Sequence, residues 1–296
     1  QNNYANGNGS FVAGVGNYAN ANQDAVFGNN DTATGANSFI SGYNNTATQN
    51  ASAVLGGNHN LAAGSNSVVL GGVNDTVTAG NAAVYGQYNR AAGSYSFAGG
   101  FQSYNNSTAG IVVGYNDTIG GFASAAFGQS TKATGNYSFA GGYQSYSANT
   151  GTVALGYQDS ATASGAVALG NKNRVTAGNG FAAGYNNVVS ASEAAALGNS
   201  NTVSGGSSLA AGNSNIISNA NGLVLGLADT VSDYAAVALN RGNVASGNHT
   251  TALGSYNTAP SYSEVAIGMY GTGYTALSAT GFNGADRVFN VGNGAS

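Results

Sequence analysis

Charged side chains and several other residue types are scarce in this chain. Cysteine and tryptophan do not occur among its 296 residues, proline occurs once, and charged residues make up 5%. Without cysteine, the chain can form neither disulfides nor thiolate-bound zinc sites. Six basic residues against ten acids leave a net charge of −4, so we expect no surface for nucleic acid. Because no apolar run approaches about eighteen residues, we predict that this segment does not insert into a membrane.

Glycine, by contrast, is abundant and recurs at a fixed interval. Many of the 48 glycines follow short apolar triplets, as in the Val-Ala-Leu-Gly copies at 153–156 and 167–170. These landmark glycines run from Gly14 to Gly268 at intervals of fourteen residues, or fifteen at two places, and Asn240 fills one slot. Such a period indicates a solenoid in which every coil repeats one unit. The landmarks include Gly56, Gly71, Gly156, Gly170, Gly198 and Gly268.

Each coil contains a strand that is apolar at three consecutive positions. The residue two before every landmark is Ala, Val or Ile, and its neighbours are mostly apolar as well. Since alternate side chains of a strand point to opposite faces, we predict burial on both faces. The two neighbours compensate in size, as in Phe139/Gly141 against Ala125/Phe127, which indicates one shared packed volume. The sequence leaves open which face points inward.

A second, half-buried strand is expected in each coil. An apolar residue with polar neighbours lies five residues after the landmark, as in Thr32-Ala33-Thr34. Asn105 and Ser147 interrupt this column, so we predict bulges there. Asn or Asp three residues after the landmark predicts a tight turn, and because most acids lie near this column we expect them at a solvated edge. A fourteen-residue coil has a perimeter of roughly 46 Å, which leaves room inside only for small side chains.

The organisation of the chain follows from this regularity. The repeat has no insertion, so we predict one continuous array over residues 1–285 rather than two domains. A strand that is apolar on both faces leaves a dry stripe on the outside of a narrow coil, and soluble monomers rarely expose such a stripe. We therefore predict that the stripe contacts other copies of the same chain.

Three segments of the repeat resemble a known family. Asn66–Gly71, Gly165–Gly170 and Ser263–Gly268 read NSVVLG, GAVALG and SEVAIG. They are similar to the head repeats of trimeric autotransporter adhesins, the YadA-like proteins of Gram-negative bacteria. The resemblance covers about residues 1–285. It implies a left-handed parallel β-roll solenoid, assembled as a homotrimer.

The resemblance also implies a function and a location. Val288–Asn293 (VFNVGN) resembles the segment where such heads meet the neck, so residues 286–296 are expected to start a neck-like connection. The parent protein would be anchored in the outer membrane through regions absent from this chain, and this head would lie at the bacterial cell surface. Heads of this family attach to host extracellular matrix, host cells or partner bacteria, which implies an adhesin without enzymatic activity. The motif is seldom literal here, so collagen binding is not carried over.

The sequence offers little for catalysis, cofactors or metals. His59 and His249 are far apart in turn regions and are interpreted as solvated turn residues rather than metal ligands. No GxSxG motif accompanies them, so a Ser-His-Asp triad is not expected. The nonapeptide calcium repeat is also missing. We predict neither a catalytic residue nor a cofactor or metal site.

One surface column is a candidate ligand contact. Arg90, Lys132 and Arg174 each lie four residues after a landmark and are separated by 42 residues, which corresponds to three coils. Residues 93–118 closely resemble residues 135–160, so the column is either a by-product of a three-coil duplication or a binding feature.

Three other functions stay open. A phage tail-fibre or receptor-binding shaft also uses trimeric β-rolls, and a folding-chaperone domain after Ser296 would favour it. An ice-binding solenoid needs a regular threonine array, which Lys132 and Arg174 interrupt. A polysaccharide-degrading β-helix normally has wider coils and clustered acids, and this sequence indicates neither.

Overall fold

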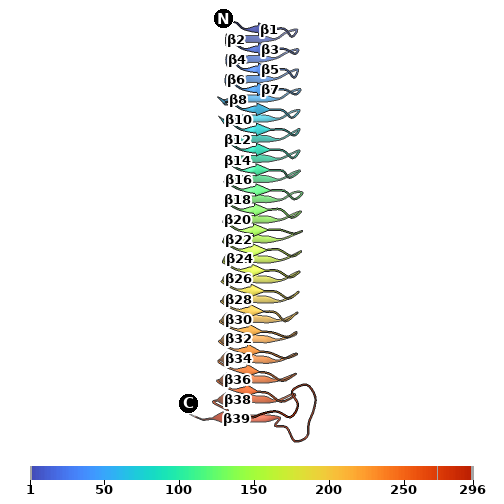
Figure 1. Ribbon diagram of the computed structural model, residues 1–296, viewed down its shortest axis with the longest axis vertical. Helices are drawn as coiled ribbons and strands as arrows, with labels where there is room; N and C mark the ends of the chain where they lie inside the picture. Colours follow the sequence, from blue (N-terminus) through green and yellow to red (C-terminus); the bar gives the residue numbers. More distant parts are fainter. Residues whose placement is uncertain (1, 272, 295–296) are drawn as a thin grey trace. The chain divides into compact units, whose positions relative to one another are not determined.

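The computed structural model describes residues 2–271 and 273–294 as β-strands joined by turns and loops. The chain divides into two compact units, Gln1–Gly151 and Thr152–Ser296. Within each unit, every coil before the final one contributes one long and one short strand, and equivalent strands of successive coils pair in parallel. Figure 1 shows the coils following one another along each unit. Each unit is therefore an all-β parallel solenoid with coils of about fourteen residues; continuity of the array between units stays a prediction.

The first unit contains two parallel sheets. Its long strands are β2 (Phe11–Val15), β4 (Ala25–Asn29), β6 (Phe39–Tyr43), β8 (Ala53–Asn58), β10 (Val68–Val73), β12 (Ala83–Gln87), β14 (Phe97–Phe101), β16 (Ile111–Tyr115), β18 (Ala125–Gln129) and β20 (Phe139–Tyr143). Its short strands are β1 (Tyr4–Ala5), β3 (Tyr18–Ala19), β5 (Thr32–Ala33), β7 (Thr46–Ala47), β9 (Leu61–Ala62), β11 (Thr76–Val77), β13 (Arg90–Ala91), β15 (Tyr104–Asn105), β17 (Thr118–Ile119), β19 (Lys132–Ala133) and β21 (Tyr146–Ser147).

The second unit repeats this arrangement and adds a final strand. Its long strands are β22 (Val153–Tyr157), β24 (Val167–Asn171), β26 (Phe181–Tyr185), β28 (Ala195–Asn199), β30 (Leu209–Asn213), β32 (Leu223–Leu227), β34 (Val237–Arg241), β36 (Thr251–Ser255), β38 (Val265–Met269) and β39 (Phe289–Asn293). Its short strands are β23 (Ser160–Ala161), β25 (Arg174–Val175), β27 (Val188–Val189), β29 (Thr202–Val203), β31 (Ile216–Ile217), β33 (Thr230–Val231), β35 (Val244–Ala245) and β37 (Thr258–Ala259).

The core lies between the long and short sheets of each unit. Val26 of β4 and Ala33 of β5 are fully buried, and the equivalent residues of the other coils form the same two columns. The residue two before the landmark therefore points inward, and its two neighbours point outward. Within the single chain the long strand is buried on its inner face only, so burial of the outer face stays a prediction about partner copies.

The landmark glycines allow successive coils to approach closely. Gly156 has a φ of 139°, and a Cβ atom built on it would lie 1.9 Å from the carbonyl oxygen of Gly170. The two fifteen-residue coils differ from the landmark positions assigned from the sequence. In these coils the close approach falls on Gly57 and Gly72 rather than on Gly56 and Gly71. A register shift accommodates each extra residue, between Ser41 and Tyr43 and between Val69 and Gly72. The same close approach occurs at Gly170, Gly198 and Gly268.

The predicted bulges at Asn105 and Ser147 are wrong. Asn105 pairs in regular register with Ala91 and Ile119, and Ser147 pairs with Ala133. Both residues are fully buried. Asn105 Nδ2 donates to the carbonyl oxygens of Phe97 and Gly110, each at 2.8 Å, and Ser147 Oγ donates to that of Phe139 at 2.7 Å. Because these side chains find partners inside the coil, the strands keep their regular path.

A buried hydrogen-bonded ladder occupies the predicted turn column. Asn187 is fully buried, and its Nδ2 donates to the carbonyl oxygens of Ala183 at 3.1 Å and Gly198 at 2.9 Å. Its Oδ1 accepts a hydrogen bond of 3.0 Å from the backbone N–H of Asn201. Equivalent residues repeat these bonds from coil to coil. The turn residues are therefore internal supports, and the expectation of a solvated edge is wrong for the acids that occupy this column.

The last coil of the second unit is irregular. β39 pairs in parallel with β38, and Phe289 lies opposite Val265. Upstream of β39, Arg287 Nε forms a 2.6 Å ion pair with the fully buried carboxylate of Glu264. Residues 289–293 thus extend the long sheet, and their expected role as the start of a neck stays a prediction.

Candidate functional site

The outer face of the long sheets carries large apolar side chains. Tyr85 is 57% exposed and Leu55 is 50% exposed, although both lie on paired strands. Phe27 contacts Phe39 of the next coil with ring centroids 5.8 Å apart, so the size compensation seen in the sequence operates between coils on this outer face. We call these outward side chains the apolar face. Its most exposed members are Phe11, Phe27, Phe39, Leu55, Leu70, Tyr85, Ile111, Val113 and Phe127 in the first unit and Leu225, Leu253, Phe289 and Val291 in the second.

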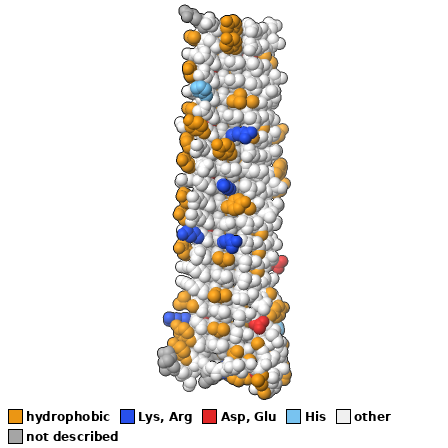
Figure 2. Space-filling view, viewed as in Figure 1, with side chains coloured by type: hydrophobic (Ala, Val, Ile, Leu, Met, Phe, Trp, Pro, Cys, Tyr) orange, Lys and Arg blue, Asp and Glu red, His pale blue; other side chains and the backbone are white. Residues whose placement is uncertain are grey.

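The outer face of the short sheets carries the basic residues of the predicted column. Arg90 on β13 and Lys132 on β19 are exposed and lie on the same sheet of the first unit, with β15 and β17 between them. Arg174, the third member of the predicted column, is exposed on β25 of the second unit, between Ser160 and Val188. The structure therefore places two of the three residues on one sheet. Figure 2 shows one side of the protein, where basic side chains are scattered over mostly uncharged surface.

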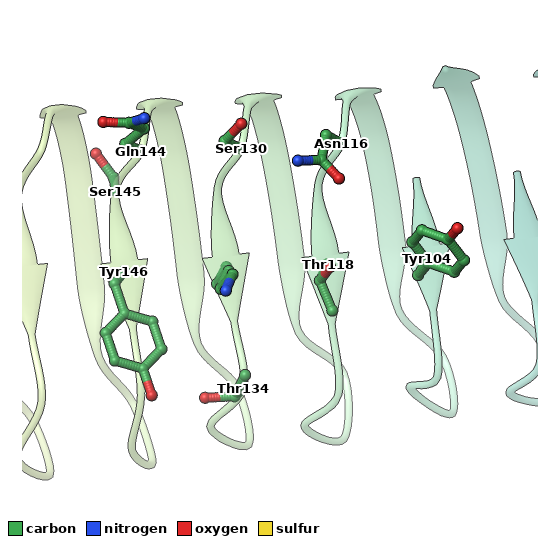
Figure 3. Close-up of a pocket in the computed structure, with 9 residues that line it drawn as sticks. Tyr104, Asn116, Thr118, Ser130, Thr134, Gln144, Ser145 and Tyr146 are labelled. Atoms are coloured by element: carbon green, nitrogen blue, oxygen red, sulfur yellow. The ribbon is translucent and has the colours of Figure 1, made fainter. Parts of the chain in front are cut away.

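Two tyrosines flank Lys132 on the short sheet of the first unit. Tyr104 on β15 and Tyr146 on β21 are 41% and 38% exposed, and Thr118 lies on β17 between Tyr104 and Lys132. These residues border a surface hollow of about 830 Å³ (Figure 3). Its lining is completed by Asn116, Ser130, Thr134, Gln144 and Ser145. The hollow contains one cation, several hydroxyl and amide groups and two aromatic rings, but no acid.

These tyrosines were not predicted from the sequence. The available signal was their spacing, because Tyr104 and Tyr146 lie 42 residues apart in the two copies of the duplicated segment. The predicted ligand contact included the charged residues of this column but not the rings of Tyr104 and Tyr146, which lie in the same column.

The aspartates of the ladder have raised pKa values. Asp75 is fully buried, and burial raises its pKa from 3.8 to about 6, although hydrogen bonds from Asn89 partly oppose this shift. Its Oδ1 accepts from the Asn89 N–H at 2.7 Å, whereas its Oδ2 has no hydrogen-bond partner in the described part of the chain. Burial raises the pKa of the equivalent acids in the same direction. These are Asp31, Asp117, Asp159 and Asp229.

The Oδ2 atom of Asp75 lies at the position where an asparagine of the ladder has its Nδ2 donor. A Cβ atom on Gly57 would lie 2.6 Å from Nδ2 of Asn60, and one on Gly72 would lie 2.5 Å from Oδ2 of Asp75. Nδ2 of Asn60 donates to two backbone carbonyls, those of Gly56 and Gly72, at 3.1 Å. An ionised carboxylate has no proton to donate at this position, whereas a protonated carboxyl does. The ladder geometry therefore favours the neutral acid.

The two histidines occupy exposed turn positions, as expected. His59 has a φ of 57° and its ring contacts Tyr43. His249 has a φ of 60° and lies between the rings of Tyr234 and Tyr262. Among residues 2–271 and 273–294, no three His, Asp or Glu side chains form a group suited to a metal ion.

Neither protein-family models nor curated proteins match this chain. Over the same described residues, no helix has the length and apolar character needed to cross a membrane.

Proposed function

We propose that this chain is the head of a bacterial surface adhesin, a left-handed β-roll that assembles as a homotrimer and binds without catalysis. The observation that carries the proposal is the apolar face of the long sheets. Side chains such as Tyr85 and Leu55 are about half exposed in one chain, although large contiguous apolar surfaces are rare on soluble monomers. Three chains that meet along this face would remove it from water.

The opposite, short-sheet surface is suited to presentation. It carries mainly hydroxyl and tyrosine side chains, with few charges and isolated aliphatic residues such as Ile216, and it repeats from coil to coil. Repeated weak contacts, multiplied by three chains, give high avidity without one strong site. The expected partners are host extracellular matrix, host cell surfaces or partner bacteria, reached from an outer-membrane anchor outside this chain. The similarity of the repeats to YadA-like heads supports the same assignment.

Trimer formation through the apolar face is tested by a matched pair of variants. Leu225 on β32 is 43% exposed on the long sheet, and Ile216 on β31 is 44% exposed on the short sheet of the same unit. Leu225→Lys should raise the trimer dissociation constant at least about tenfold, because it places a charge in a desolvated interface. Ile216→Lys should leave it unchanged. Sedimentation equilibrium measures both, and a monomeric unmodified chain would contradict the proposal.

Adhesion itself is tested with the purified trimeric head. It should bind saturably to at least one immobilised matrix protein, host cell line or bacterial surface, with the binding lost when the trimer is dissociated. A head that binds to none of these surfaces would refute the adhesin function, even if the trimer forms.

A further inference from the structure

The hollow on the short sheet of the first unit has the form of a ligand site. Figure 3 shows Tyr104 and Tyr146 at its two ends with Thr118 between them, while Asn116, Ser130 and Gln144 lie in a row along one edge. Tyr104 and Tyr146 are three paired strands apart, which corresponds to roughly 14 Å. The hollow therefore suits an elongated ligand that lies across several coils.

The chemistry of the lining selects among ligand classes. Both tyrosines expose part of their rings, and aromatic faces stack on the apolar C–H faces of sugar rings. The hydroxyl groups of Thr118, Ser130 and Thr134 match a ligand that is rich in hydroxyl groups. The lining has no deep apolar pocket for a hydrophobic anchor, and the neighbouring strands β15, β17 and β19 are each paired on both sides, so no peptide can add to the sheet here.

Lys132 determines the charge of the ligand. It is exposed between two paired neighbours, Thr118 and Tyr146, and it makes no ion pair within the described residues. No acid lines the hollow, and the nearest acid along the strand, Asp117, is buried in the ladder. The unpaired ammonium group therefore favours a ligand that carries negative charge. Arg90, paired beside Tyr104, adds a second positive charge one coil outside the lining.

We propose that this hollow binds a short anionic oligosaccharide, with sugar rings stacked on Tyr104 and Tyr146 and an acidic group at Lys132. The proposal rests on the adhesin function and names the class of receptor that the head contacts. Thr118, Asn116 and Gln144 orient the sugar hydroxyls, and the repetition of the site in three chains gives avidity.

The first test measures binding of defined oligosaccharides to the trimeric head by titration calorimetry. The probes are a hyaluronan hexasaccharide, which carries carboxylates, a heparin hexasaccharide, which also carries sulfates, and neutral chitohexaose. We expect the two anionic probes to bind more tightly than chitohexaose, and their ratio separates carboxylate from sulfate recognition. Equal binding of all three, or preference for the neutral sugar, would overturn the proposal.

Substitutions locate the site. Tyr104→Ala and Tyr146→Ala should each weaken binding about fivefold, whereas the phenylalanine variants keep the ring and should bind nearly as well as the parent. Lys132→Gln should weaken binding of the anionic probes about fivefold and leave chitohexaose unaffected. Tyr18→Ala is the matched control, because Tyr18 is 41% exposed in the same column but outside the hollow. Unchanged melting temperatures verify that the variants fold.

The outcomes distinguish this site from the adhesin function. If the Tyr104→Ala/Tyr146→Ala double variant binds the anionic probes as the parent does, the site is wrong. If the head adheres to cells but binds none of the probes, the site is also wrong while the adhesin function stands. If the head neither adheres nor binds a probe, both proposals fail.

Discussion

The coils around residues 103–147 of the first unit and those around residues 173–217 of the second unit have the same backbone but different interiors. In the coils around residues 173–217 the ladder consists of consecutive asparagines, and the facing core column is aliphatic. In the coils around residues 103–147 the ladder lacks asparagine, and polar side chains enter the core column. The second-unit residues are Asn173, Asn187, Asn201 and Asn215 with Val175, Val189, Val203 and Ile217; the first-unit residues are Ser103, Asp117, Thr131 and Ser145 with Asn105 and Ser147.

The comparison shows that this backbone depends on glycine placement and strand pairing more than on one interior sequence. Strands β15 to β19 keep regular register although Asn105 is buried between Ala91 and Ile119. The coils whose interior sequence departs from the repeat are also those that carry the hollow. Departures from a repeat consensus are expected where a surface has a function. The polar interior and the proposed glycan site therefore fall on the same coils.

The largest expected effect tests the glycine requirement that the coils of both units share. Gly57 and Gly56 are adjacent and both have positive φ, but a Cβ atom on Gly57 would lie 2.1 Å from the Gly72 carbonyl oxygen, whereas one on Gly56 meets nothing within 4 Å. Gly57→Ala should destabilise the protein by about 4 kcal/mol or more. Gly56→Ala should cost about 1–2 kcal/mol, from backbone strain alone. Urea unfolding followed by circular dichroism compares them, and equal costs would show that coil approach is not limiting.

The next effect concerns the two kinds of ladder. Asn187→Ala removes donors to Ala183 and Gly198 and the acceptor for Asn201, so it should cost about 3 kcal/mol. Ser103→Ala removes one long bond of 3.3 Å to Gly114 and should cost about 1 kcal/mol or less. Amide hydrogen exchange should show the loss of protection confined to the coils next to each substitution. Similar losses at both sites would mean that the asparagine ladder adds no special support.

A smaller effect is pH dependence in the first unit. Because the folded pKa of Asp75, about 6, lies above its ordinary value of 3.8, the folded state binds the proton more tightly. Its stabilisation is complete below about pH 4 and is lost as the pH rises through 6, with a total change of about 3 kcal/mol. Asp75→Asn should remove the contribution of Asp75 to this slope, while the other ladder acids keep theirs. It should also stabilise the protein at pH 7, because the amide can donate where Oδ2 cannot.

The pH profiles of thermal unfolding of the parent and of Asp75→Asn measure this effect. If Asp75→Asn retains the parent profile, the titration belongs to other groups.

Much of the fold follows from the sequence because a solenoid repeats one local pattern. The interval between Gly156 and Gly170 predicts the coil length, and the triplet before each glycine predicts the long strand. Which face of that strand points inward could not be predicted from the sequence, because Ala154 and its two neighbours are all apolar. The structure resolves it: Ala154 is fully buried, while Val153 and Leu155 are partly exposed.

The site was less accessible to sequence reasoning. Arg90 and Lys132 were identified from their spacing, but the hollow depends on which side chains occupy the coils between them. The burial of Asp75 was missed because asparagine and aspartate are common in both solvated turns and internal ladders. The two environments differ only in whether a neighbouring coil covers the side chain, and this is visible only in the structure.

The irregular final coil of the second unit has a consequence for how such proteins change in evolution. The number of coils in a stack of identical coils is not fixed by the fold, since each coil contacts only its neighbours. The excursion that leads through the Arg287–Glu264 ion pair into β39 breaks the periodicity at the end of this stack. Coils can therefore be gained or lost upstream, as the similarity of residues 93–118 and 135–160 illustrates, without rebuilding the terminus. The number of coils can therefore change in evolution while the final coil stays constant.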